Sequence, residues 1–309
     1  MDMDTFVTTV YVMADDFCKS RAAAWPVQPG PAPALAVSEI VTLAVLSRWS
    51  RFQSERDFFR YAQQQLRPAF PSLPAYRQFN RLGRAAGAWL ARFSHALAAQ
   101  LGTLANVYEA LDTMGCATRN AKRRGNGWLA GEANLGWCNR LGWYEGLNVI
   151  TSVTPAGAIT GFGCAPASTK EQPYAETFLQ ARAVQPDWLP EVGAAPAGWY
   201  LADNGFCGRK LHQHWAEDYG ARVISPPQRH QSRQPWPKPW RRWLASLRQI
   251  VETVHARLLQ TFRLERERPH HLQGFRARLA ATCALHNFCL WLNIQLGRPK
   301  LAFADLIDW

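Results

Sequence analysis

The sequence lacks the patterns that mark several large protein classes. Its 7 cysteines are odd in number and never form a Cys-x-x-Cys pair, so neither a disulfide framework nor a zinc ribbon is indicated. No apolar run approaches the roughly 18 residues that a membrane-spanning helix needs. A Walker loop, a dinucleotide-binding fingerprint and a Gly-x-Ser-x-Gly elbow are also missing. A soluble globular protein of another class is therefore expected.

Acidic residues are the scarcer charged type. Lys and Arg number 35 against 23 Asp and Glu, which gives a net charge of +12. This balance favours a polyanionic partner, with nucleic acid as the first candidate, although many basic proteins are merely cationic. The N-terminal stretch MDMDTFVTTV is acidic where a signal peptide would be basic. We expect a reduced, cytoplasmic protein without a membrane partner.

Two regions of different pattern follow a proline-rich connector at 25–34. Helical spacing from Ser38, from Ser54 and over much of 75–101 predicts a small all-helical region at 1–104. Short β-branched runs then predict strands at 106–112, 146–154, 158–165, 198–203 and 221–226. Helical stretches are predicted at 171–183, 208–219, 241–262 and 273–296. A mixed α/β domain at 105–300, followed by a tail at 301–309, is expected.

An aspartate ends each of two predicted strands. Asp112 closes NVYEALD and Asp203 closes GWYLAD, and the carboxyl ends of strands are where α/β sheets bind ligands. Each aspartate could instead be an ordinary turn residue that caps its own backbone. We expect Gly205 to give the chain a sharp exit, so that Asp203 faces a site rather than capping its own turn.

A third acid lies on a predicted helix. The apolar stripe of this helix consists of Leu244, Leu247, Val251, Val254 and Leu258. Glu252 lies off the stripe, in line with Arg241, Arg248 and His255. The alternative is a solvated Arg248–Glu252 pair, but Arg before Glu is the less favourable order and stabilises a helix by a few tenths of a kcal/mol at best.

Three carboxylates and many cations suit one kind of chemistry. Hard oxygen ligands select Mg²⁺ or Mn²⁺, and two such ions roughly 4 Å apart can hold both oxygens of an in-line phosphoryl displacement. Positive charge clusters near the acids in sequence, in 119–124 and 229–242. The second of these segments interleaves tryptophan with cations, as a nucleic-acid surface does, although a solvated proline-rich loop is equally compatible.

Three motifs in order resemble the DDE transposases of bacterial insertion sequences. They are ALDTMGC around Asp112, YLADNGF around Asp203 and RQIVETVHARL around Glu252, with separations of 203 − 112 = 91 and 252 − 203 = 49. LAVSEIVTLAVL and LPAYRQFNRLGR also resemble the N-terminal DNA-binding helices of one branch. The resemblance covers roughly 35–296 and implies an RNase H-like mixed sheet flanked by helices, preceded by a small helical DNA-binding region.

The resemblance implies that Asp112, Asp203 and Glu252 are the catalytic triad and hold two Mg²⁺ or Mn²⁺ ions. It implies a transposase that binds the terminal inverted repeats of its element in double-stranded DNA, cleaves there and transfers strands, as a homodimer in the synaptic complex and associated with the nucleoid. The basic residues that we expect to contact DNA are Arg77, Arg81, Arg84, Arg119, Lys122, Arg123, Arg124, Arg241 and Arg248.

The chain departs from the family at two positions. Many relatives carry Tyr-x2-Arg-x3-Glu-x6-Lys around the glutamate, but here Ala245 and Leu259 replace the tyrosine and the lysine. Arg257 or Arg263 are candidates for the missing cation. Two alternatives stay open: a transposon-derived DNA-binding protein without catalysis, and a stand-alone RNase H-like nuclease.

A second motif, Cys283-x2-His286-x2-Cys289, invites a zinc interpretation. It lies in an apolar helical stretch, where cysteine behaves as a small hydrophobic residue. We therefore expect a core helix at this point.

Overall fold

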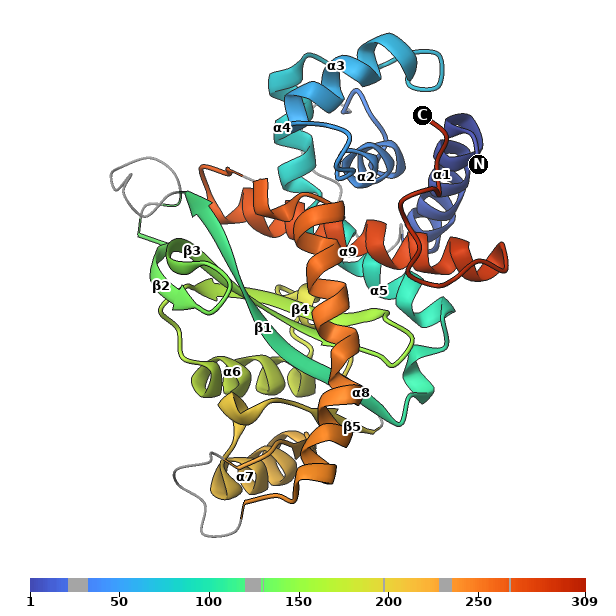
Figure 1. The fold of residues 1–309 in the computed structure, drawn as a ribbon. Coiled ribbons are helices and arrows are strands. Elements are labelled where there is room, and N and C mark those ends of the chain that lie inside the picture. Colours follow the sequence, from blue (N-terminus) through green and yellow to red (C-terminus); the bar gives the residue numbers. More distant parts are fainter. Residues whose placement is uncertain (22–32, 120–128, 130, 197, 228–234, 267) are drawn as a thin grey trace.

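The computed structural model describes residues 1–21, 33–119, 129, 131–196, 198–227, 235–266 and 268–309 (Figure 1). The α-helices are α1 (Met3–Ser20), α2 (Val37–Leu46), α3 (Glu55–Gln65), α4 (Tyr76–Ala85), α5 (Gly87–Gln100), α6 (Glu171–Val184), α7 (Arg209–Tyr219), α8 (Lys238–Ala256) and α9 (Leu272–Gln295). The strands are β1 (Tyr108–Arg119), β2 (Asn134–Cys138), β3 (Gly142–Val153), β4 (Ile159–Pro166), β5 (Trp199–Leu201) and β6 (Val223–Ile224). The prediction of a mixed α/β protein with helices before the sheet is confirmed.

One six-stranded sheet forms the centre of the molecule. Its order is β2-β3-β1-β5-β6, with β4 paired to β3. β1, β3 and β4 pair antiparallel, whereas β5 adds parallel to β1 and β6 parallel to β5. β2 was not predicted, because its isolated pattern NLGWC is too short to signal a strand without its antiparallel partner β3.

Strand alternation gives the sheet two different faces. On one face, Ala110 and Met114 of β1 join the large core that includes α5 and α9. On the other face, Leu111 and Ile150 pack against α6 and α7 in a smaller core. Because side chains of a strand alternate with a period of two, Asp112 belongs with the first face and Thr113 with the second. Figure 1 shows α8 crossing β1 on the first face.

The prediction that Asp112 ends its strand is wrong. β1 continues to Arg119 and pairs with β3 from Ala110↔Val153 onward, so Asp112 lies in its middle. Gly115 is tolerated in this strand because Tyr144 of β3 fills the space beside it, where an added Cβ would lie 2.9 Å from the tyrosine hydroxyl. Long-range pairing thus overrides the turn preference of aspartate.

The N-terminal helices form as expected with one difference. Ser54 caps α3, since its hydroxyl accepts a hydrogen bond from Asp57 N at 3.1 Å. The stretch at 75–101 forms two helices that meet at Ala86 instead of one. They have different packing partners: Phe79 of α4 stacks against Phe58 and Phe59 of α3, whereas α5 packs along α9.

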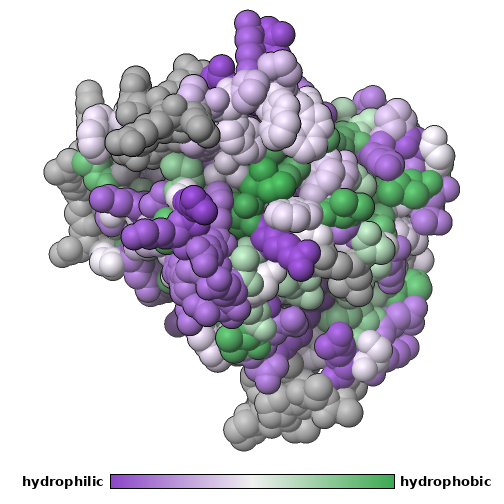
Figure 2. All heavy atoms as spheres, turned by 90° about the horizontal axis from the view of Figure 1, so that it is seen from below, coloured by the Kyte–Doolittle hydropathy of each residue, from purple (hydrophilic) through white to green (hydrophobic). Residues whose placement is uncertain are grey.

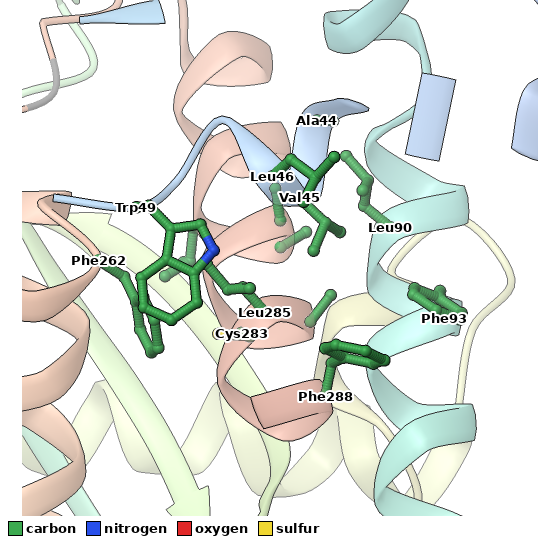
Figure 3. Close-up of a cluster of buried hydrophobic side chains, with 14 of the residues drawn as sticks. Ala44, Val45, Leu46, Trp49, Leu90, Phe93, Phe262, Cys283, Leu285 and Phe288 are labelled. Carbon is green, nitrogen blue, oxygen red and sulfur yellow. The ribbon is translucent and has the colours of Figure 1, made fainter. Parts of the chain in front are cut away.

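The large core joins the N-terminal helices to the helices after the sheet (Figure 3). Trp49 meets Phe262 at a ring-centroid distance of 5.4 Å, and Phe6 meets Phe288 of α9 at 5.2 Å, both edge to face. Such aromatic pairs contribute about 0.5–1.5 kcal/mol each beyond burial. Residues 1–104 and the sheet therefore share one continuous apolar interior.

The Cys-x2-His-x2-Cys motif lies in α9 inside this core. All three side chains are buried, and His286 Nε2 lies 2.8 Å from the carbonyl oxygen of Gly157. Burial raises the pKa of the Cys283 and Cys289 thiols well above the ordinary value, which disfavours the thiolate that binds metal. The prediction of a core helix is confirmed.

The surface is mixed in character. Seen from the α7 end, hydrophilic residues cover much of the face and separate smaller hydrophobic patches (Figure 2). Within the described residues, we find no helix with both the length and the apolar character needed to cross a membrane.

Candidate active site

Asp112 and Asp203 lie at the same level of two neighbouring strands. β1 and β5 pair in parallel with Ala110 opposite Leu201, and each aspartate lies two residues beyond its member of that pair. The two side chains therefore point from the same face of the sheet. The short β5 thus brings together two acids that are 91 residues apart in sequence.

The Asp112 carboxylate is largely enclosed, with 16% of its side chain exposed. Its Oδ1 accepts a hydrogen bond from Thr113 N at 2.8 Å, and its Oδ2 lies 3.2 Å from Arg248 Nη2. Burial raises the pKa of Asp112 to about 7, and the charges of Asp203 and Glu171 act in the same direction, while Arg248 opposes them. The site thus concentrates negative charge in an enclosed place.

Asp203 has a role in its own turn as well as in this cluster. Residues 204–206 form a 3₁₀ turn, and Asp203 Oδ1 accepts a hydrogen bond from Gly205 N at 2.8 Å. The expectation that Asp203 does not cap its own turn is therefore wrong. The physical reason is that the first amides of a helical turn have no partner within it, and the carboxylate supplies one.

Glu171 is a nearby acid that the sequence analysis missed. It opens α6, and its Oε1 accepts a hydrogen bond from Thr113 Oγ1 at 3.3 Å. Burial, and then the charge of Asp203, raise the pKa of Glu171 above its ordinary value. The sequence signal was weak, because an acid in the first turn of a helix is already explained by the helix dipole.

Helix α8 carries Arg248, Glu252 and His255 along one side. Arg248 reaches Asp112, and His255 Nε2 lies 2.8 Å from Thr151 Oγ1. Thr151 is the β3 residue directly opposite Asp112. Because residues four and three apart share a helix face, the exposed Glu252 lies between these two anchor points, at the rim of the site.

The oxygen donors suit a hard divalent cation by their chemistry. Carboxylates are the ligands that Mg²⁺ and Mn²⁺ prefer, and the mutual repulsion of Asp112 and Asp203 is what a cation between them relieves. In the described parts of the chain, no three His, Cys, Asp or Glu side chains form a group that could hold an ion. The donor set therefore fits such an ion, while the described side chains are not drawn together around one.

The basic residues expected to contact DNA are distributed over several elements. Arg77 and Arg81 are exposed on α4, whereas Arg84 is half-buried and lines a cavity together with Arg48 and Glu55. Arg241 is half-buried at the start of α8, and Arg248 is engaged with Asp112. Arg119 ends β1, while Lys122, Arg123 and Arg124 lie outside the described residues.

The two positions that depart from the family pattern differ in environment. Ala245 is exposed on α8, but Leu259 is buried in the large core. Arg263 is also buried, and its guanidinium donates to the carbonyl oxygens of Phe52 and Ser47. Arg263 is therefore not a substitute for the missing lysine, because its charge holds the core together.

A curled mixed sheet with acids at one level and a helix across it defines the class of protein. Residues 117–288, more than half of the chain, match the family model described as the transposase DDE domain. The chain belongs to this family. Asp203 and Glu252 lie within the matched residues, and Asp112 lies just before them. Comparison with curated proteins and with solved structures gave no match.

Proposed function

We propose that the protein is a transposase with Asp112, Asp203 and Glu252 as its catalytic triad. The observation that carries this proposal is the level placement of Asp112 and Asp203 on β1 and β5, with Arg248 of α8 on Asp112. The strand order β4-β3-β1-β5-β6 supports an RNase H-like core, as expected from the sequence. The family match supports phosphodiester chemistry on DNA.

The triad would hold two Mg²⁺ or Mn²⁺ ions, which supply activation of the attacking oxygen and stabilisation of the leaving oxygen. Asp112 and Asp203 contribute their carboxylates from fixed strands, and backbone amides of Thr113 and Gly205 orient them. Arg248 favours the charged form of Asp112 against burial. Glu252 stands at the exposed rim, where DNA would enter.

Double-stranded DNA is the proposed partner. A net charge of +12 and the exposed Arg77 and Arg81 on α4 support binding of a polyanion by the N-terminal helices. We include Arg84, Arg119, Lys122, Arg123, Arg124, Arg241 and Arg248 in the proposed DNA surface. Recognition of terminal inverted repeats, strand transfer and a homodimer in the synaptic complex belong to the same proposal, as do the cytoplasm and the nucleoid as its places of action.

The experiment uses duplex DNA that carries the sequences flanking the coding region. Asp203→Asn and Glu252→Gln should each abolish Mg²⁺-dependent cleavage while end binding in a mobility-shift assay stays within about threefold. Undiminished cleavage by both variants would refute the proposal. Binding without cleavage by the unaltered protein would favour a non-catalytic DNA-binding protein, and cleavage without strand transfer would favour a nuclease.

A further inference from the structure

Glu171 touches both segments that hold the two aspartates. On one side, Glu171 Oε1 accepts the hydroxyl hydrogen bond of Thr113, and Thr113 N donates to Asp112 Oδ1. On the other side, the Glu171 carboxylate packs directly on the backbone of Gly205, and Gly205 N donates to Asp203 Oδ1. The residues that orient Asp112 and Asp203 are thus joined through a single side chain.

The absence of a side chain at Gly205 makes this arrangement possible. A Cβ added at Gly205 would overlap with Glu171 Oε2 and would lie 3.0 Å from Asp203 Oδ1. Any larger residue there would displace the Glu171 carboxylate from the turn. Glycine is therefore needed at 205 for close approach rather than for an unusual backbone angle, since its φ is outside the left-handed region.

The two contacts of Glu171 come from the opposite side of the sheet to Arg248. Thr113 and Asp112 alternate on β1, so Thr113 faces α6 while Asp112 faces α8. Glu171 is anchored by α6, whose Tyr174, Ala175 and Phe178 are buried against the sheet. A rigid helix thus supports the two aspartates from the side that Arg248 does not reach.

We propose that Glu171 is a positioning residue of the active site, which ties Thr113 to the 203–205 turn and so fixes the spacing of Asp112 and Asp203. This inference rests on the proposed function of those aspartates. Residues that orient metal-binding side chains typically contribute 10- to 100-fold to metal affinity or activity, by roughly that general range. Glu171 would act by accepting the Thr113 hydrogen bond and by filling the space beside Gly205, which a glutamine can also do.

The experiment combines Mn²⁺ titration calorimetry in the absence of DNA with plasmid nicking in Mn²⁺. Glu171→Ala should weaken Mn²⁺ binding and lower the nicking rate constant by about tenfold or more. Glu171→Gln should retain both within about threefold, because the amide oxygen still accepts from Thr113. Gln180→Ala, which removes an exposed side chain from the same helix, is the matched control and should change neither.

A second pair of variants checks that the effect passes through the turn. Gly205→Ala should reproduce the loss seen for Glu171→Ala, and the double variant should be no worse than either single variant, because both disrupt the same contact. Thermal unfolding of each variant controls for folding. Equal Mn²⁺ affinity of Glu171→Ala and the unaltered protein would overturn the inference, and so would a Glu171→Gln variant as impaired as Glu171→Ala.

Failure of this inference can be told apart from failure of the proposed function. Asp203→Asn serves as the reference in the same assays. If Asp203→Asn binds Mn²⁺ and nicks DNA normally, the proposed function itself fails. If Asp203→Asn is impaired while Glu171→Ala is not, only the positioning role of Glu171 is refuted.

Discussion

Arg248 of α8 and Asp112 of β1 form an ion pair of 3.2 Å in which only 12% and 16% of the two side chains are exposed. This pair fixes α8 over the middle of the strand that carries the proposed first catalytic acid. It is also the direct link between the sheet and the helix that carries Glu252. Its removal should therefore affect both stability and the geometry of the site.

Arg248→Ala should lower the free energy of unfolding by about 3 kcal/mol, because loss of one partner leaves a buried charge uncompensated. Urea unfolding measures the change. Arg242→Ala removes an exposed arginine from the same helix and should cost less than about 0.5 kcal/mol. Equal stability of the two variants would show that the pair does not hold α8 in place.

Arg182→Ala should be among the most destabilising single changes in the protein. Arg182 is fully buried, its Nη1 lies 2.9 Å from Glu109 Oε2, and Glu109 is only 2% exposed. We expect a loss of about 3–5 kcal/mol, since Glu109 would remain buried without its cation. The double variant Arg182→Met/Glu109→Leu should recover a large part of this loss in urea unfolding. A double variant as unstable as the single one would contradict that explanation.

The stability of the α6–α7 contact should depend on pH through His214. Hydrogen bonds to Glu176, and then to Asp218, raise the pKa of His214 above its unfolded value of 6.5. A raised folded-state pKa stabilises the protein fully below pH 6.5, and this contribution is lost as pH rises through the folded pKa.

His214→Gln should therefore be less stable than the unaltered protein near pH 5.5 and close to it near pH 8.5. Thermal unfolding at the two pH values measures this difference, and NMR titration gives the folded pKa directly. A folded pKa at or below 6.5 would contradict the prediction.

Gly198→Ala should disturb the pairing that sets Asp203 level with Asp112. A Cβ at Gly198 would overlap with the carbonyl oxygen of Val107, which accepts the hydrogen bond of Trp199 N at 2.9 Å. We expect a loss of roughly 1–3 kcal/mol, as for other overpacked sites, together with weaker Mn²⁺ binding.

Gly83→Ala is the matched control for Gly198→Ala. Gly83 lies within α4, and nothing lies within 4 Å of an added Cβ. The change should stabilise the protein by roughly 0.5–1 kcal/mol, because alanine favours the helix. A Gly198→Ala variant as stable as Gly83→Ala would mean that β5 is free to shift along β1.

Much of the fold follows from local patterns. The cap at Ser54, the buried positions Leu244, Val251 and Val254 of α8, and the apolar stretch of α9 are all visible as periodicity or as a cap residue. These features depend on neighbours along the chain. Prediction of them needs no knowledge of the sheet.

The parts that sequence reasoning missed depend on distant partners. Asp112 has the preferences of a turn residue, but β3 continues to pair beyond it. Glu171 becomes part of the site only because the β1–β5 register brings Thr113 and Gly205 together. Arg263 has the sequence character of a surface cation, yet it donates to carbonyl groups more than two hundred residues away.

β1 carries two carboxylates whose charges are balanced in different ways. Glu109 is neutralised within the interior by Arg182, whereas Asp112 shares its surroundings with other acids and awaits positive charge from outside. In copies of the element that no longer move, selection for folding would still retain Glu109. Asp112 would then drift freely, so the two positions of one strand record separately whether a copy still folds and whether it still cuts.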